Sequence, residues 1–305
     1  MRVDVPLEML QRLDRPGPRY TSYPAVPAWT TDFGAEQWRE ALEDLAGQPD
    51  RDVSLYVHLP YCVKRCHYCG CNAAISDSGN QDTDRERYLD HLERELDTVA
   101  KLLGRRQVVQ MHWGGGTPNY QSDEQLRRTY HLVADRFDLV GEVSIECDPR
   151  AAKADQPHVL RELGFNRISM GVQDFDPRVQ EAIGRRQPEK VTRRFVDSCR
   201  EAGFESVNLD LVYGLPHQTA QVLADSLEKV LALEPDRLAV FGYAHVPWAK
   251  PQQKLIDEST LPSADERFTL YQQAVETLTE AGYVWIGLDH FARPDDELAV
   301  ALAAK

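Results

Sequence analysis

Strand-like and helix-like segments alternate along most of this chain. Apolar runs with the character of strands occupy residues 54–59, 108–113, 142–147, 167–172, 206–212, 237–243 and 283–288. Amphipathic stretches of helical period fill the intervals, at residues 84–103, 122–136, 157–163, 177–183, 191–202, 219–233 and 264–281. Strand followed by helix, repeated six times, requires right-handed crossovers and a parallel sheet. Runs such as VSLYV and RISMGV predict strands that are covered on both faces.

Two α/β folds share this alternation, the Rossmann sheet and the (β/α) barrel. Polar residues stand here at the carboxyl ends of many successive strands, namely His58, the turn 114–117, Glu146, Asp148, Gln173, Asp174, Asp210 and His245. Barrel active sites are assembled at that rim from many strands, whereas Rossmann sites gather at one or two crossing points. The pattern therefore predicts an α/β fold with a partial (β/α)6 barrel over residues 51–290.

The segments on either side of this predicted barrel differ from it. Residues 1–50 form a predicted N-terminal extension, rich in proline and aromatic residues, with one amphipathic helix near residues 35–45. In residues 291–305, Pro294 and the acidic residues after it are typical of a helix N-terminus. We expect that last helix to have no packing partner, and we interpret 291–305 as the start of a truncated C-terminal region.

Composition excludes several classes of protein. The 305 residues are 42% hydrophobic and 28% charged, which is typical of a globular domain. A net charge of -14 provides no general attraction to nucleic acids or anionic lipids. There is no apolar stretch of about 18 residues, the length of a membrane span, and no signal-peptide pattern. We expect a cytoplasmic, monomeric protein with no nucleic-acid or membrane partner.

Four of the six cysteines crowd into residues 62–71, directly after the first predicted strand. In a reducing compartment such crowding favours metal or cluster ligation over disulfides. Cys62, Cys66 and Cys69 have the spacing C-x3-C-x2-C, and three thiolates from one loop suit a [4Fe–4S] cluster with one open iron. The alternative is zinc with Cys71 as fourth ligand, although zinc sites usually combine ligand pairs from separate places in the chain.

Two motifs together resemble the signature of the radical S-adenosylmethionine (SAM) enzymes. The first is the cysteine loop LYVHLPYCVKRCHYCGC, and the second is the glycine turn MHWGGGTPNY at residues 111–120. Glycine lets a backbone approach a ligand closely, and the resemblance implies that this turn holds the amino group of SAM. Cys71 and the segments RYTSYP, SIECDPR, RISMGVQDF, LDLVYGLPHQT, FGYAHVP and DHFARPDDELA are similar to the oxygen-independent coproporphyrinogen III oxidase (coproporphyrinogen dehydrogenase) family. That family continues into a helical C-terminal domain beyond this sequence.

The resemblance implies a site that holds one [4Fe–4S] cluster and two SAM molecules. The implied cluster ligands are Cys62, Cys66 and Cys69. The implied contacts of the first SAM are Tyr56, Gly115 and Glu146. Those of the second SAM are Tyr68, Gly116, Thr117, Gln173, Arg185, Asp210 and Ala244. Tyr56 and His58 are the implied catalytic residues, close to the reacting group of the substrate.

The implied reaction is an oxidative decarboxylation. Reductive cleavage of SAM provides a 5′-deoxyadenosyl radical that removes hydrogen from a propionate side chain, and carbon dioxide and an electron then leave. Two such turns convert coproporphyrinogen III to protoporphyrinogen IX, with an unidentified electron donor. The alternatives are a haem chaperone, a haem-degrading methyltransferase, and a non-catalytic zinc or cluster protein. RYTSYP and Cys71 argue against the chaperone.

Several of these residues also have a purely structural interpretation. Glu146 and Asp210 are alternatively buried carboxylates paired with an arginine, and His58 a histidine of the core. Arg185 is alternatively part of a solvated helix end. The candidate cations for the substrate carboxylates are Arg19, Lys64, Arg65, Arg186 and Arg293. The isolated cysteines, which are predicted to be buried as small apolar side chains, are Cys147 and Cys199.

Overall fold

A single eight-stranded sheet forms the centre of the computed structural model, which describes residues 9, 12, 28–76 and 79–304. Six parallel strands follow one another in chain order, namely β1 (Val53–Leu59), β2 (Gln107–Gly115), β3 (Asp138–Cys147), β4 (Arg167–Gln173), β5 (Ser206–Tyr213) and β6 (Arg237–Gly242). Beyond β6, β8 (His290–Ala292) runs antiparallel to it, and β7 (Val284–Gly287) runs antiparallel to β8. β1 and β7 are the two edges of the sheet. The predicted partial barrel is confirmed.

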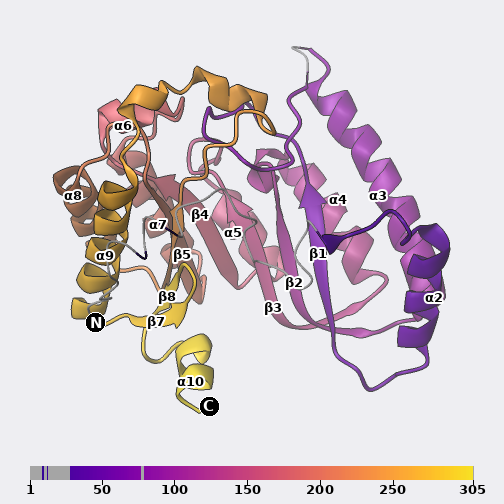
Figure 1. Cartoon of the computed structure of the whole chain (residues 1–305). Helices are drawn as coiled ribbons and strands as arrows, with labels where there is room; N and C mark the ends of the chain where they lie inside the picture. Colours follow the sequence, from indigo (N-terminus) through magenta and orange to yellow (C-terminus); the bar gives the residue numbers. More distant parts are fainter. Residues whose placement is uncertain (1–8, 10–11, 13–27, 77–78, 305) are drawn as a thin grey trace.

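Helices cover the outer face of the curved sheet (Figure 1). They are α3 (Gln81–Leu103), α4 (Asp123–Ala134), α5 (Gln156–Leu163), α6 (Pro177–Ala182), α7 (Glu189–Glu201), α8 (Ala220–Leu231) and α9 (Ala264–Glu280). Every predicted helical stretch overlaps one of them, and the ends differ by at most three residues. The N-termini of α4 and α9 follow from capping boxes, in which Ser122 and Ser263 exchange hydrogen bonds with Gln125 and Glu266.

The two faces of the strands differ in character. On β4 the outward side chains of Ile168, Met170 and Val172 are buried in the main apolar core, under the helices. The inward residues from Arg167 to Gln173 are polar or glycine, and they line a cavity inside the barrel. The same alternation holds along β3 and β5. The prediction of strands covered on both faces was therefore wrong, because the inner face surrounds a cavity.

Near the N-terminus, α2 (Ala35–Ala46) packs against α3. Three 3-10 helices, η2 (Pro118–Tyr120), η3 (Pro251–Leu255) and η4 (Glu258–Thr260), lie in loops. The segment RYTSYP, with Arg19, lies outside the described residues. None of the helices in the described ranges has the length and apolar character that crossing a membrane requires.

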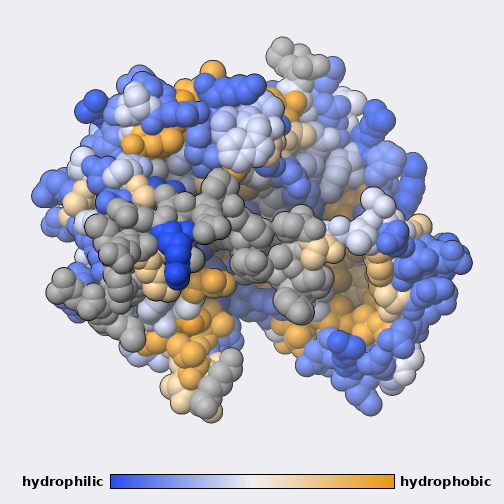
Figure 2. Space-filling view, in the orientation of Figure 1, coloured by the Kyte–Doolittle hydropathy of each residue, from blue (hydrophilic) through white to orange (hydrophobic). Residues whose placement is uncertain are grey.

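The last helix, α10 (Glu297–Ala303), packs against β7, and its Ala299 is buried. Its N-cap residue Asp296 forms a 2.7 Å ion pair with Arg237 of β6. The expectation that this helix has no packing partner was wrong, because its partner stands 59 residues earlier in the chain. Figure 2 shows hydrophobic residues around β7, β8 and α10, and the exposed ones are Leu288, Leu298, Val300 and Leu302.

Candidate functional site

The cysteine loop leaves β1 at the carboxyl end of the sheet and is held there by backbone hydrogen bonds. The Cys62 N–H donates to the carbonyl of Ala74 over 3.0 Å, which closes the loop at its base. The His67 N–H donates to the carbonyl of Ile183 over 2.9 Å, which ties its middle to the end of α6. Because these bonds are made by the backbone, they leave the cysteine side chains free to face the barrel.

A cavity of about 960 Å³ occupies the barrel beneath this loop. All four cysteines of the loop line it, as do the glycine turn and inward side chains of β2 to β6. The predicted site residues that line it are Cys62, Cys66, Cys69, Tyr68, Gly115, Gly116, Thr117, Glu146, Gln173, Arg185, Asp210 and Ala244. One concave surface therefore collects residues from most of the length of the chain.

The surroundings of the cysteines suit thiolates. The Thr117 hydroxyl donates to Cys62 Sγ over 3.2 Å. The guanidinium groups of Arg150 and Arg185 approach Cys66 Sγ at 3.7 and 3.9 Å. Donors and cations near sulfur stabilise its anionic form, the form that ligates iron. The donor set therefore fits an iron–sulfur cluster.

The pKa values of the cysteines in the loop shift in opposite directions. The Cys71 thiol and N–H donate to Cys69 and lower the pKa of Cys69 to about 6. Burial raises the pKa of Cys62. Within the described ranges, no three His, Cys, Asp or Glu side chains converge as the ligands of a single metal ion would.

The glycine turn fits against the cysteine loop with no room for side chains. A Cβ on Gly116 would lie 2.3 Å from the carbonyl oxygen of Pro60. Gly115 has a φ of 115°, and a Cβ there would lie 2.6 Å from the His58 ring. These glycines are therefore required by backbone approach and by a left-handed conformation.

Tyr56, in the middle of β1, and His58, near its end, form a hydrogen-bonded pair. Tyr56 Oη lies 3.1 Å from His58 Nδ1, and His58 Nε2 lies 3.0 Å from the carbonyl oxygen of Asn72. The Tyr56 side chain is 59% exposed, and its ring stacks on that of His112. His58 is hydrogen-bonded at both nitrogens, yet it lies beside the exposed Tyr56 at the mouth of the barrel.

Glu146, at the end of β3, faces the glycine turn. Its Oε2 accepts the Gly115 N–H over 3.3 Å, and its Oε1 lies 3.3 Å from His112 Nε2. At the end of β5, Asp210 accepts hydrogen bonds from Asn208 over 2.7 Å and from Ser169 over 3.3 Å. In the described part of the chain neither carboxylate forms an ion pair with an arginine, so the interpretation of the two as members of buried ion pairs was wrong.

The pKa of Asp210 is raised to about 7, because burial disfavours its charge and the nearby Glu146 repels it. At neutral pH the group therefore both donates and accepts hydrogen bonds, depending on its protonation. Such a group suits a ligand with hydroxyl or amino groups.

Arg185 is buried and is not a solvated helix end. Its Nη2 donates to the carbonyl of Gly171 over 2.7 Å, and its Nη1 lies 3.1 Å from Asp148 Oδ2. Its Nε has no hydrogen-bond partner among the described residues, although the residue lines the cavity. Gln173 nearby has a φ of 70°, which is strained for a residue with a side chain. The guanidinium of Arg185 therefore places a fixed positive charge in the wall of the cavity.

The connection between β6 and α9, residues 243–263, lies on the cysteine loop. Lys250 Nζ lies 3.1 Å from Asn72 Oδ1, and Gln253 Nε2 donates to the carbonyl of Tyr68 over 2.9 Å. Figure 1 shows the two segments side by side at the upper end of the barrel, in purple and orange. Sequence reasoning missed Lys250 and Gln253, because an irregular segment has no periodicity that points to a partner.

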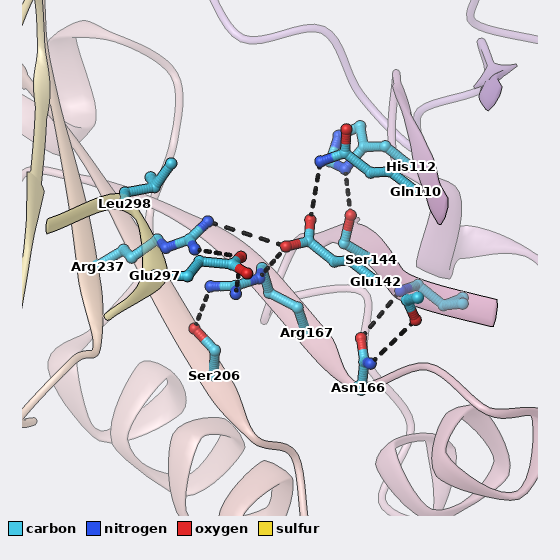
Figure 3. A network of polar contacts seen from close by, with 12 residues as sticks. Gln110, His112, Glu142, Ser144, Asn166, Arg167, Ser206, Arg237, Glu297 and Leu298 are labelled. Atoms are coloured by element: carbon cyan, nitrogen blue, oxygen red, sulfur yellow. Dashed lines mark hydrogen bonds and ion pairs between the residues drawn. The ribbon is translucent and has the colours of Figure 1, made fainter. Parts of the chain in front are cut away.

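A network of ion pairs fills the opposite end of the cavity (Figure 3). Glu142 Oε2 lies 2.7 Å from Arg167 Nε and 3.9 Å from Arg237 Nη1, and Glu142 Oε1 accepts from Gln110 over 3.2 Å. Glu297 Oε1, at the start of α10, lies 3.1 Å from Arg167 and 2.9 Å from Arg237. The network ties α10 directly to β4 and β6, and through their arginines to Glu142 of β3.

Comparison with known proteins agrees with this architecture. The family model of the radical SAM superfamily matches residues 56–230. The chain belongs to the radical SAM superfamily.

Within this superfamily the chain is a homologue of the oxygen-independent coproporphyrinogen III oxidases. The sequence is 44% identical to that of Escherichia coli (strain K12) over 302 residues, which are 98% of this chain and 65% of the relative. It is also 44% identical to that of Synechocystis sp., over 98% of this chain and 64% of the relative. The solved structure of coproporphyrinogen III oxidase from Escherichia coli, a radical SAM enzyme, superimposes with a TM-score of 0.89 at 42% identity, covering 99% of this chain and 67% of that one. The chain spans about 65% of the length of the Escherichia coli relative.

Of the basic side chains predicted to bind substrate carboxylates, some line the cavity and others do not. Lys64 and Arg65 line the cavity. Arg186 is exposed and pairs with Glu181 at 2.6 Å. Arg293 donates to the main-chain carbonyls of residues 234 and 235, away from the cavity. Cys147 and Cys199 are buried, as predicted.

Proposed function

We propose that this chain catalyses the SAM-dependent oxidative decarboxylation of two propionate side chains of coproporphyrinogen III, giving protoporphyrinogen IX. The observation that carries the proposal is the convergence of the cysteine loop, the glycine turn and Arg185 on one cavity. The relatives of 44% identity carry the name of this activity, and their greater length makes the whole reaction a proposal for this chain.

In this proposal Cys62, Cys66 and Cys69 hold a [4Fe–4S] cluster. The cluster and SAM, when bound, supply a 5′-deoxyadenosyl radical. The first SAM contacts Tyr56, Gly115 and Glu146. The second contacts Tyr68, Gly116, Thr117, Gln173, Arg185, Asp210 and Ala244.

The protein's own groups orient the reactants. The Glu146 carboxylate, which the Gly115 N–H orients over 3.3 Å, is an acceptor for an amino group. The Arg185 guanidinium, in the wall of the cavity, provides a positive charge for the carboxylate of SAM. Tyr56 and His58, bonded to each other, stand where a substrate side chain enters the barrel.

We propose that the substrate carboxylates bind to the cations at the mouth of the cavity. Lys64, Arg65 and Lys250 line it, and in the described part of the chain none of them is paired with a carboxylate. The other arginines that line the cavity, Arg150, Arg167, Arg185 and Arg237, each pair with a carboxylate. In a protein of net charge -14, this local excess of positive charge favours an anionic substrate. We also propose a cytoplasmic monomer that receives electrons from a separate donor.

The test is anaerobic reconstitution with iron and sulfide, followed by dithionite, SAM and coproporphyrinogen III. Both 5′-deoxyadenosine and carbon dioxide are expected, with about one SAM consumed per vinyl group formed. Deoxyadenosine without carbon dioxide contradicts this substrate and favours a related haem-handling protein. If a chain with a full cluster forms neither product, the proposal that it is an enzyme is contradicted.

Matched cysteine variants separate a cluster from zinc. Cys69→Ser is expected to lose the iron and the visible absorption of the reconstituted chain. Cys71→Ser, a neighbouring thiol of the same loop, is expected to retain both. Loss of the metal from both variants to the same extent, with zinc as the metal recovered, contradicts the cluster.

A further inference from the structure

Because the sheet is open, strand pairing does not fix the distance between its first and sixth parallel strands. β1 and β6 are separated by four strands, and the hydrogen bonds of a sheet fix only adjacent strands. The loop after β1 and the connection after β6 nevertheless lie side by side, as Figure 1 shows, and both contribute residues to the lining of the cavity. Some other contact must therefore set the distance between them.

Gln253, in η3, makes that contact with its side-chain amide. Nε2 donates to the carbonyl of Tyr68 over 2.9 Å and to the carbonyl of Ala244 over 3.1 Å. Oε1 accepts the N–H of Val246 over 2.6 Å. The residue is 1% exposed, so water does not compete for these bonds. One buried amide thus joins the cysteine loop to the end of β6.

The rest of the connection holds Gln253 in place. Tyr243 Oη lies 2.8 Å from His245 Nδ1, and His245 Nε2 lies 3.0 Å from Glu258 Oε1, which pins η4 to the end of β6. Gln252 Nε2 donates to the carbonyl of Cys69 over 2.5 Å. Gln253 therefore acts from a braced segment, and its amide has little freedom to follow a displaced loop.

We propose that Gln253 is a positioning residue for SAM, which holds Tyr68 and Ala244 at a fixed separation across the cavity. The inference rests on the proposed function, in which both of those residues contact the second SAM. The two carbonyls require two N–H donors, so a carboxylate of the same size cannot replace the amide. None of the bonds of Gln253 reaches a cysteine, so the cluster does not depend on it.

The first arm of the test needs no cofactor. Hydrogen exchange of the apo chain is compared in wild type, Gln253→Glu and Gln273→Ala. Gln273 is the matched control, because its Nε2 donates to the carbonyl of Ala220 over 2.9 Å, between α9 and α8. In Gln253→Glu, residues 66–74 and 244–256 are expected to exchange at least about tenfold faster. Unchanged exchange in both segments overturns the proposal.

The second arm uses the reconstituted chains and measures iron content and equilibrium binding of SAM. Gln253→Glu is expected to keep its iron. Of the two SAM molecules, it is expected to bind the more weakly held one at least about tenfold less tightly than wild type does. Gln273→Ala is expected to match wild type. If wild type and Gln253→Glu bind SAM equally tightly, the role of Gln253 is contradicted while the proposed function is not. Full iron without any SAM binding in wild type contradicts the proposed function itself.

Discussion

Replacing Gly116 with alanine tests the contact between the glycine turn and the cysteine loop. The new Cβ would lie 2.3 Å from the carbonyl oxygen and 2.6 Å from the carbonyl carbon of Pro60. The first of these is roughly 1 Å short of ordinary van der Waals contact, which begins at 3.4 Å. Both neighbours are backbone, so no side chain can rotate away and the turn itself must move.

The cost follows from what that movement breaks. The Gly116 N–H donates to the carbonyl of Leu59 over 2.9 Å, and the Thr117 N–H donates to the carbonyl of Tyr61 over 3.0 Å. Two such bonds contribute about 1 kcal/mol each, and overpacking costs about 1–3 kcal/mol. The expected decrease in the free energy of unfolding is therefore about 3–5 kcal/mol.

Gly70→Ala, in the same cysteine loop, is the matched control. A Cβ at Gly70 meets no atom within 4 Å, so its effect is expected to stay within about 0.5 kcal/mol. Both variants are compared with wild type by urea denaturation of the apo chain, and then by iron content after reconstitution. Gly116→Ala with the stability of Gly70→Ala would refute the reasoning.

Three further changes test other parts of the site. Asp210, with a folded pKa of about 7 against an ordinary 3.8, binds its proton more tightly when folded, so its contribution to stability decreases as pH rises between those values. Urea titrations should therefore show Asp210→Asn gaining stability relative to wild type from about pH 5 to 7; a constant difference would contradict the raised pKa. Glu142→Gln removes one of the carboxylates that Arg167 and Arg237 share, while Asp296 and Glu297 still pair with both, so thermal unfolding should show a loss of about 2 kcal/mol; a change under about 0.5 kcal/mol would mean that Glu142 contributes nothing to the network of Figure 3. Tyr56→Phe removes a hydroxyl of a 59% exposed side chain, so stability should change by less than about 1 kcal/mol while turnover decreases at least about tenfold; equal turnover would remove Tyr56 from the catalytic residues.

The sequence alone was sufficient for most of the elements. Strand and helix periods are local properties, and the helices begin at short capping signals such as Ser122 and Ser263. β8 was missed because three residues are too few to show a period. The cysteine spacing and the glycine turn were equally readable, since both motifs are contiguous in the chain.

The inner face of the barrel was less predictable. The segment RISMGV reads as apolar, yet Ser169 and Gly171 line the cavity while Ile168 and Met170 face the helices. Which face of a strand points into the barrel depends on how the sheet curves, and that curvature is decided by the packing of the whole fold. Which of the candidate cations face the cavity was undetermined for the same reason.

What the sequence determined by itself is therefore the alternation of elements, the parallel order of the strands and the motifs of the two loops after β1 and β2. Each of these follows from local period, local spacing or the fixed handedness of strand–helix–strand crossovers. The tertiary structure alone decided that Gln253 bonds to Tyr68, 185 positions away, and that α10 pairs with Arg167 and Arg237. Contacts over such separations depend on where the folded chain brings two segments together, and no local pattern encodes them.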